Sequence, residues 1–452
     1  MRHISTFGRS LWITIAFAVL VLVTKLFAQV DDGNSYITKA EFDAFLREYR
    51  SRSNDSAIPI MPPPAADKSL AWKKGQFTIT PYGYINVSAS YESEKSVAGD
   101  YIVYANSPDI DGKPAFFIDP RSTRLGVSVD APGFKTWEGS KSKAVVEVDF
   151  QGSYSIRNRG SLMLRKAFVE VGNDMAKFII GQDWEVLSPL YPQTLNYTAG
   201  AGTGNIGYRR AQLRYDRKFF VTQHTNWLLQ TAMVDNVLRD GFNAAPAVTP
   251  NVSDWPIIEG RLAYTFRKGY TDCQPITLGV SAHVGEQRFD FVESSVRETR
   301  KLQTWSFNID ADVPITNKLR LQAELFLGDN LGSFEGGVIQ GVDLTRRDTI
   351  RSQGGWVDLE YRWTDKLRTN ICYMIDDPYN EDVVSGNATN NTARNYCHCI
   401  FGNILYNWTP ALMTGFEVNF WKTHWQKYES NKVVPMRAGE PVRFEFVTRY
   451  TF

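Results

Sequence analysis

The last segment of the chain alternates strictly between two kinds of side chain. From residue 442 to the terminal Phe452, every second position is apolar, aromatic or threonine, and the positions between include Arg443, Glu445 and Arg449. Because neighbouring side chains on a β-strand point to opposite faces, this strand has one apolar face and one largely charged face. It therefore suits either a soluble sheet with a buried core face or a membrane barrel with lipid outside and water inside.

The same alternation recurs in the middle of the chain. Residues 303–313, 319–328 and 354–364 each place aliphatic and aromatic side chains on one face and carboxylates, amides or guanidinium groups on the other. Burying ionised groups in a dry core is costly, whereas a water-filled lumen accommodates them. The pattern therefore favours a barrel over a soluble sandwich.

Sixteen candidate strands, an even number as in bacterial single-chain barrels, follow from this pattern. Most have about the length of a tilted membrane strand. Long and short connections alternate along the chain, as external loops and periplasmic turns do in outer-membrane barrels. We therefore predict an all-β fold, a 16-stranded antiparallel transmembrane β-barrel over residues 77–452. The predicted strands are 77–91, 117–131, 142–152, 162–172, 176–184, 206–217, 226–235, 257–267, 276–286, 303–313, 319–328, 354–364, 367–376, 395–407, 412–421 and 441–452.

The N-terminal region indicates export. A basic start precedes an apolar run over residues 11–23, and Ala28 offers a small-residue cleavage point. This order is typical of a secretory signal peptide, which we place at 1–28, with a signal anchor as the alternative. Residues 29–76 are predicted to form a short periplasmic helix followed by a proline-rich linker to the barrel.

Four cysteines are too few for a disulfide scaffold in a chain of 452 residues. Cys397 and Cys399 share one strand face, and a symmetric hairpin would place Cys372 opposite Cys399. A cross-strand disulfide and free thiols both stay open at this point. Cys397-His398-Cys399 lacks the ligand spacing of a zinc site.

Charged side chains gather on the predicted inner faces of neighbouring strands. Where Leu125 and Val127 face outward, Arg124 faces inward, and the same reasoning applies to the other strands. Opposed basic and acidic walls would create a transverse field that attracts and orients anionic or dipolar solutes. For each charge the alternative is a solvated or structural role, and alternation leaves open which of Arg165 and Lys166 faces inward. The residues expected to line the channel are Arg124, Glu147, Asp149, Arg210, Gln212, Arg214 and Arg261.

The connection 185–205 carries a run of small residues at 199–204, whose glycines would let backbone pack close to the barrel wall. In position and length it is similar to the third external loop of 16-stranded trimeric porins, which folds into the lumen and narrows it. The alternative is an external loop that stays outside the pore. The resemblance implies a constriction formed by Asp183, Glu185, Tyr191, Asn196 and Tyr197.

Three short motifs carry a more specific resemblance. The Arg-Leu-Gly-Val sequence at 124–127, the Arg-Ala-Gln-Leu-Arg sequence at 210–214 and the closing Phe452 resemble the DcaP-like porins, a family of dicarboxylate-type channels. The resemblance covers roughly residues 77–452. It implies a homotrimer in outer-membrane lipid, assembled by machinery that recognises Phe452, which takes up small anionic solutes including dicarboxylates.

Enzyme motifs are missing from the sequence. It contains neither Gly-x-Ser-x-Gly nor HExxH, and none of its five histidines lies beside a plausible nucleophile or metal partner. We therefore expect no catalytic residue, no metal and no cofactor. A formal net charge of +1 gives no indication of a nucleic-acid partner.

These observations predict a passive outer-membrane porin for small polar or anionic solutes, narrowed by an inward-folded loop. Two alternatives remain at this point. One is a structural or adhesive barrel with a plugged lumen, and the other is a soluble secreted β-rich protein that binds glycans.

Overall fold

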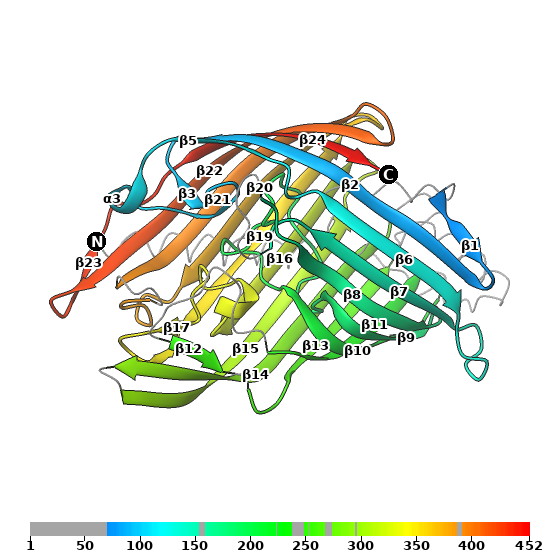
Figure 1. Ribbon diagram of the computed structural model, residues 1–452, viewed down its shortest axis with the longest axis horizontal. Coiled ribbons are helices and arrows are strands. Elements are labelled where there is room, and N and C mark those ends of the chain that lie inside the picture. The colour runs from blue at the N-terminus through cyan, green and yellow to red at the C-terminus, as the bar shows by residue number, and fades with distance from the viewer. Residues whose placement is uncertain are drawn as a thin grey trace.

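The computed structural model describes residues 70–152, 159–222, 224–236, 248–251, 253–266, 274–293, 296–386 and 391–452. They form a closed barrel of 16 antiparallel wall strands (Figure 1), which confirms the predicted fold class. The signal peptide, the periplasmic helix and the linker up to residue 69 lie outside the described residues. The wall strands are β2 (Phe77–Glu92), β5 (Ala115–Asp119) continued by β6 (Arg124–Pro132), β7 (Lys141–Asp149), β8 (Met163–Gly172), β9 (Ala176–Trp184), β10 (Arg209–Phe219), β11 (Thr225–Val234), β13 (Ile257–Phe266), β14 (Ile276–Glu293), β15 (Val296–Pro314), β16 (Leu319–Asp329), β19 (Arg351–Arg362), β20 (Leu367–Pro378), β21 (Thr392–Asn407), β22 (Leu412–Glu429) and β24 (Val442–Thr451).

The outer surface of the barrel is apolar. On β24, Phe444 and Phe446 are 42% and 47% exposed, whereas the alternating Arg443 and Glu445 are 0% and 3% exposed. Apolar side chains outside and charged side chains inside are the arrangement of a membrane barrel, not of a soluble sheet. Among the described residues, no helix is long and apolar enough to cross a membrane.

The barrel closes between its first and last wall strands. β24 pairs with β2 from Tyr84 opposite Thr451 to Glu92 opposite Arg443. The terminal residue completes this seam, because the backbone N–H of Phe452 donates to the Gly83 carbonyl at 3.1 Å and Gly83 donates back at 3.3 Å. Both ends of the barrel-forming chain thus meet along one seam.

Deleting Phe452 is expected to lower the yield of membrane-inserted protein strongly, because it removes both seam hydrogen bonds and the predicted assembly signal. Heat-modifiable gel mobility of purified outer membranes measures this yield. Phe452→Tyr keeps the backbone pair and an aromatic ring, so it should insert like the native chain. Normal insertion of the deletion variant would contradict the predicted role.

One of the predicted strands is divided into two strands in the structure. Residues 117–131 divide into β5 and β6, and both pair with β2. Ser88 lies opposite Asp119, but Tyr84 lies opposite Arg124, so residues 85–87 face residues 120–123. The extra residue is a β-bulge within 120–123, and Pro120 at its start has no N–H to contribute to the ladder.

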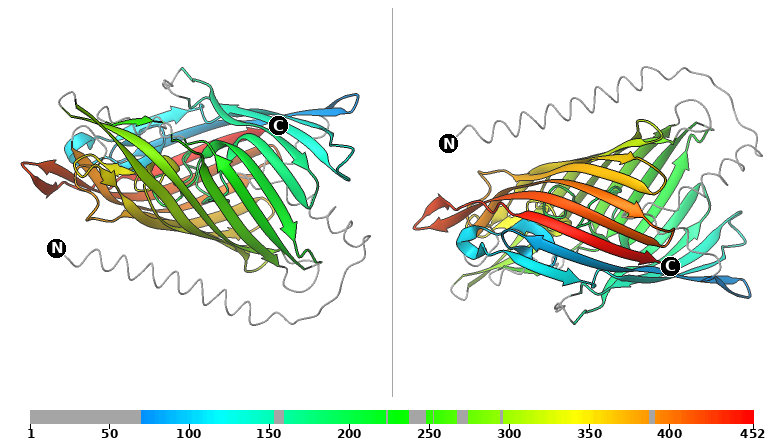
Figure 2. Two further views of the ribbon diagram at one scale, coloured as in Figure 1. Left: turned by 90° about the horizontal axis from the view of Figure 1, so that it is seen from below. Right: turned by 90° about the horizontal axis from the view of Figure 1, so that it is seen from above.

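Two predicted connections are continuous β-ribbons instead. β14 and β15 stay paired as far as Glu293 opposite Val296, well past the predicted strand ends at 286 and 303. A short strand, β12 (Val248–Asn251), pairs with the extended part of β14. The predicted loop 422–440 likewise contains the end of β22 and β23 (Lys432–Pro435), which form a hairpin that projects from one end of the barrel (Figure 2). Strand length was estimated from membrane thickness, which sets no limit on a ribbon beyond the membrane.

The register of β20 and β21 decides between a Cys372–Cys399 disulfide and free thiols. Cys372 lies opposite Phe401, and Met374 lies opposite Cys399. The assumed symmetric hairpin was therefore wrong by two residues. Cys372, Cys397 and Cys399 are buried free thiols, and Cys273 lies outside the described residues.

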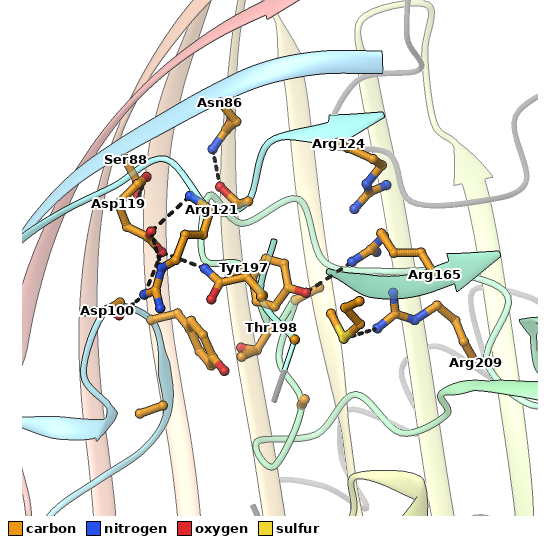
Figure 3. A pocket seen from close by; sticks show the side chains of 18 of the residues that line it. Asn86, Ser88, Asp100, Asp119, Arg121, Arg124, Arg165, Tyr197, Thr198 and Arg209 are labelled. Atoms are coloured by element: carbon orange, nitrogen blue, oxygen red, sulfur yellow. Dashed lines mark hydrogen bonds and ion pairs between the residues drawn. The ribbon is translucent and has the colours of Figure 1, made fainter. Parts of the chain in front are cut away.

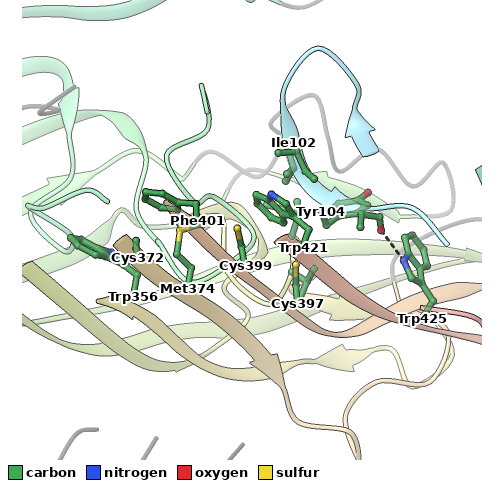
Figure 4. Close-up of a cluster of buried hydrophobic side chains, with 14 residues drawn as sticks. Ile102, Tyr104, Trp356, Cys372, Met374, Cys397, Cys399, Phe401, Trp421 and Trp425 are labelled. Carbon is green, nitrogen blue, oxygen red and sulfur yellow. Dashed lines mark hydrogen bonds between the residues drawn. The ribbon is translucent and has the colours of Figure 1, made fainter. Parts of the chain in front are cut away.

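Part of the inner wall is apolar, which alternation did not predict. Side chains from β19 to β22 point inward and form a buried cluster with residues of the first connection, 93–114 (Figure 4). That connection contains β3 (Ser96–Ala98), β4 (Ile102–Ala105) and the short α3 (Pro108–Asp111). Burying each large apolar side chain here stabilises the fold by roughly 1.5–3 kcal/mol. The cluster comprises Ile102, Val103, Tyr104, Ala105, Val338, Ile339, Trp356, Cys372, Met374, Cys397, Cys399, Phe401, Trp421 and Trp425.

Candidate functional site

Two connections lie together inside the barrel. The first, 93–114, is bound to β22, which lies beyond β24 from β2: the Ala105 N–H donates to Thr423 Oγ1 at 3.0 Å, and Trp425 Nε1 donates to the Ala105 carbonyl at 2.9 Å. It is also tied to the connection 185–208 by Asn196, whose side chain bonds both the N–H and the carbonyl of Ile102, at 3.2 and 2.8 Å. The two segments therefore form a single layer, which we call the interior layer.

Three inward-facing carboxylates hold the middle of segment 185–208. Glu324 on β16 accepts from the Leu190 N–H at 2.8 Å and from the Ser188 hydroxyl. On β19, Asp358 accepts from the Gln193 N–H at 2.7 Å, while Glu417 on β22 accepts from the Leu195 N–H at 2.7 Å and from Thr194 at 2.6 Å. Since no ion pair of these three carboxylates occurs among the described residues, most of their hydrogen-bonding capacity serves segment 185–208.

The same segment packs closely against the wall at one glycine. Gly204 has a φ of +113°, and a Cβ there would lie 2.3 Å from the Gly355 carbonyl oxygen and 2.6 Å from that of Ile375. A side chain at this position would push the segment off β19 and β20. The small-residue run thus permits contact between loop backbone and wall backbone.

The end of the segment is fixed by an ion pair. Arg210, fully buried on β10, pairs with Glu185 and donates to the Ser333 carbonyl at 2.6 Å. Glu185 also accepts from the Tyr208 N–H at 2.9 Å. The guanidinium carbon of Arg210 lies 4.2 Å from the ring centre of Phe334 in the short helix η2 (Gly332–Phe334). Arg210 therefore anchors two connections at once.

A cavity of about 810 Å³ lies on the opposite side of the interior layer from the apolar wall. Its lining comes from β2, β5, β6, β8, β9, β10 and β24 and from both segments of the layer (Figure 3). Five arginines contribute to the lining. They are Arg121, Arg124, Arg165, Arg209 and Arg449.

Two of these arginines reach the cavity because of β-bulges. The bulge at residues 120–123 puts Asp119, Arg121 and Arg124 on the same inner face. On β8, Lys166 lies opposite Glu147 and Leu164 lies opposite Val148, so Arg165 is an inserted residue. Bulges re-aim side chains in this way, and strict alternation cannot anticipate them.

Arg165 stands at the centre of a hydrogen-bonded network. Its guanidinium donates to Glu147 at 3.1 Å, to Asp149 at 2.5 Å and to the Tyr197 hydroxyl at 3.2 Å. Burial raises the pKa of the Tyr197 phenol, so this group stays protonated and donates to Asp149 at 2.8 Å. The network joins segment 185–208 to β7 and β8.

The predicted channel-lining residues all face inward, but their surroundings differ. Arg124 lines the cavity, and its Nε lies 3.4 Å from Glu147 Oε1. Glu147 and Asp149 serve as ion-pair partners beside it. Elsewhere, Arg214 pairs with Asp216 at 2.7 Å and Arg261 with Asp310 at 2.6 Å, while the Gln212 amide donates to backbone carbonyls at 3.0 Å. Among the seven predictions, Arg124 is the one that lines the cavity, and Arg210, Gln212, Arg214 and Arg261 do not reach it.

The predicted constriction residues divide in the same way. Tyr191 and Tyr197 line the cavity. Asp183 pairs with Lys166 at 3.2 Å, and Glu185 and Asn196 hold the interior layer in place. Arg121 and Arg209 were not predicted, the first because of a bulge and the second because it starts a strand beside a loop, and the orientation of Arg165 was left open. No group of three or more possible metal ligands occurs in the part of the chain that the structure describes.

The fold was compared with solved structures. No protein-family model and no curated protein matches the chain. The outer membrane channel DcaP of Acinetobacter baumannii superimposes with a TM-score of 0.64 at 17% identity, covering 84% of this chain and 99% of that one. An anion-selective porin from Comamonas acidovorans gives a TM-score of 0.48 at 11% identity, over 83% of this chain and 100% of that one. OmpT of Vibrio cholerae gives 0.49 at 12% identity, over 84% and 100%. The similarity to DcaP shows that this chain has the fold of a 16-stranded outer-membrane porin.

Proposed function

We propose that this protein is an outer-membrane porin through which small polar or anionic solutes diffuse passively. One observation carries the proposal: inside a closed barrel with an apolar outer surface lies a cavity of about 810 Å³ lined by five arginines. Positive charge at a narrow, low-dielectric site raises the local concentration of anions. The interior layer narrows the lumen, and the fold supports a homotrimer in outer-membrane lipid.

A second candidate function has specific support. The interior layer and the apolar wall fill one side of the lumen, as in a barrel that is plugged and serves a structural or adhesive role. The two functions differ in one measurable property, since a plugged barrel has negligible conductance. Purified protein in planar bilayers should show discrete conductance steps, and their absence would favour the plugged barrel.

Anion preference is expected to depend on the arginines of the cavity. Replacing Arg124 and Arg449 by Gln together should lower the anion-to-cation permeability ratio by roughly threefold or more, because both line the cavity. Reversal potentials under a KCl gradient report this ratio. Arg437→Gln removes one positive charge from an exposed position outside the cavity and should leave the permeability ratio unchanged. Equal ratios in all three proteins would contradict the role of these arginines.

A further inference from the structure

Acidic and basic side chains of the cavity lie at different positions along the same strands. On β24, Glu445 and Arg449 both line the cavity and lie four residues apart. β5 and β6 repeat this order, because Asp119 and Arg124 pair with positions of β2 that are also four residues apart. A strand rises about 3.3 Å per residue, so the two kinds of charge are separated by about 13 Å. We call the two ends of the cavity the acidic end, at Asp119 and Glu445, and the arginine end, at Arg124 and Arg449.

The acidic end has more carboxylates than guanidinium groups. In the ion pairs of the described residues, the guanidinium groups of Arg121 and Arg443 each lie between two carboxylates. A carboxylate has about four lone-pair sites, so one that binds an arginine can still accept hydrogen bonds from an ammonium group. The four carboxylates are Asp100 and Asp119 around Arg121, and Glu92 and Glu445 around Arg443.

The arginine end has the opposite balance of charge. Four guanidinium groups lie there, and two of them share the carboxylates of Glu147 and Asp149. Even with Glu335, the remaining carboxylate of the lining, counted at this end, positive charge is in excess. Figure 3 shows the acidic and basic groups on opposite sides of Tyr197. The four arginines are Arg124, Arg165, Arg209 and Arg449.

Arg209 gives the arginine end a reason to bind an anion. Its side chain is 5% exposed, and no ion pair of Arg209 occurs among the described residues. Its Nη2 donates to the Tyr208 hydroxyl at 3.1 Å, but its Nε and Nη1 have no hydrogen-bond partner among those residues. A buried guanidinium with unused donors is costly unless an acceptor completes it. A carboxylate of a solute would supply both the acceptors and the missing charge.

We propose that the cavity binds elongated zwitterions, which carry a carboxylate at one end and an ammonium group at the other. The carboxylate lies at the arginine end, held by Arg209, and the ammonium group lies at the acidic end, beside Asp100 and Asp119. This inference rests on the proposed function, because the solute must reach the cavity through the barrel. A separation of about 13 Å, less one hydrogen bond of about 3 Å at each end, leaves about 7 Å between the charged groups of the solute.

The distinguishing group of such a solute is the one that reaches the acidic end. The arginine end can hold more than one carboxylate, because Arg124, Arg209 and Arg449 lie there together. At the acidic end, however, the excess of carboxylates repels an anion and attracts a cation. Oppositely charged ends of a narrow, low-dielectric cavity therefore bind and orient a solute that carries both charges.

The test uses the full-length protein in planar bilayers at pH 7, where three solutes are titrated against the single-channel KCl current. ε-Aminocaproate is the elongated zwitterion. ε-Hydroxycaproate has the same length and carboxylate but an uncharged hydroxyl in place of the ammonium group, and glycine is a zwitterion too short to reach both ends. ε-Aminocaproate should block at a concentration about tenfold lower than either of the others, the scale of one hydrogen bond to a charged group. An anion-preferring channel without the acidic end would favour ε-hydroxycaproate instead.

Two variants divide the binding between the two ends. Asp100→Asn should raise the half-blocking concentration of ε-aminocaproate by about fivefold or more and should not raise that of ε-hydroxycaproate. Arg209→Gln should raise both to a similar extent, because both solutes contain the carboxylate. Asp109→Asn is the matched control. It lies in the same connection as Asp100 but pairs with Arg437 at an exposed position outside the cavity, so it should change neither.

The outcomes separate the two proposals. If the native protein lacks conductance, the proposed function fails. If it conducts anions but ε-hydroxycaproate or glycine blocks as well as ε-aminocaproate, or if Asp100→Asn shifts the block by ε-aminocaproate and ε-hydroxycaproate equally, this inference alone is overturned. Heat-modifiable mobility confirms that each variant is folded. The comparison of the three solutes needs only the native protein, so it decides the question even where a variant does not insert.

Discussion

The triple variant Glu324→Ala, Asp358→Ala, Glu417→Ala is expected to conduct several-fold more current per channel than the native protein. These carboxylates accept the N–H groups of Leu190, Gln193 and Leu195 across the lumen. Leaving a buried donor without a partner costs roughly 1–3 kcal/mol. Losing three acceptors at once therefore releases the middle of segment 185–208 and widens the path.

Two further variants and one chemical probe make this expectation specific. Glutamine and asparagine keep one acceptor oxygen at each position, so Glu324→Gln, Asp358→Asn, Glu417→Gln should give an intermediate conductance. Glu360→Ala removes an inward carboxylate that pairs with Arg362 and does not bind the segment, so it should leave conductance near the native value.

Thiol labelling reports the position of the segment directly. Cys397 is fully buried, and its sulfur lies 3.3 Å from the Thr203 hydroxyl. In a Cys273→Ser background, a water-soluble thiol reagent should label the triple alanine variant faster than the native protein. Unchanged conductance together with unchanged labelling would show that the carboxylates do not hold the segment.

Arg443→Met is expected to destabilise the folded barrel by about 3–5 kcal/mol, the usual cost of removing one member of a buried ion pair. Arg443 and Glu92 are both 0% exposed and pair across the closing seam. Arg443 also donates to the Asp100 carbonyl at 2.8 Å and to Glu445 at 3.1 Å. The substitution therefore leaves Glu92 and Glu445 buried without their shared counter-charge and removes the hydrogen bond that holds Asp100 of the first connection.

Urea unfolding in liposomes, followed by tryptophan fluorescence, measures this loss. Adding Glu92→Gln to Arg443→Met removes one of the two uncompensated carboxylates and should recover part of the stability. Arg437→Met breaks an exposed ion pair with Asp109 and should change stability by less than about 1 kcal/mol. If Arg443→Met and Arg437→Met lost equal stability, the buried pair would not be a main support of the seam.

The alternation of apolar and polar side chains was enough to predict the barrel, because the two faces of each strand lie in different surroundings. Each wall strand separates lipid from the lumen, so its residues must differ from one position to the next. Alternation assigned Arg124 to the inner face, and in the structure this side chain lines the cavity. Arg121 was not assigned there and Arg165 was left open, because a bulge inserts one residue and so breaks the alternation of faces along the strand. Pro120 was the visible signal for the first bulge, whereas no comparable residue marks the second.

The apolar inner wall was beyond this reasoning for a different reason. Cys397, Cys399 and Phe401 alternate with His398 and Ile400, so the outer face of β21 is only partly apolar here while its inner face is wholly apolar. Such a stretch does not say which face meets lipid or what covers the other. The answer depends on contacts between distant parts of the chain, such as Trp425 with Ala105.

That separation in the sequence has a consequence for the order of assembly. The apolar wall comes from β19 to β22, in the last quarter of the chain, while its cover comes from residues 102–105 near the beginning. Contacts between such distant segments form late, because a long loop must close before they can be made. The buried apolar cluster inside the barrel therefore forms only after nearly all of the wall strands have formed. Until then residues 102–105 stay in contact with water, and the interior of the incomplete barrel is not filled.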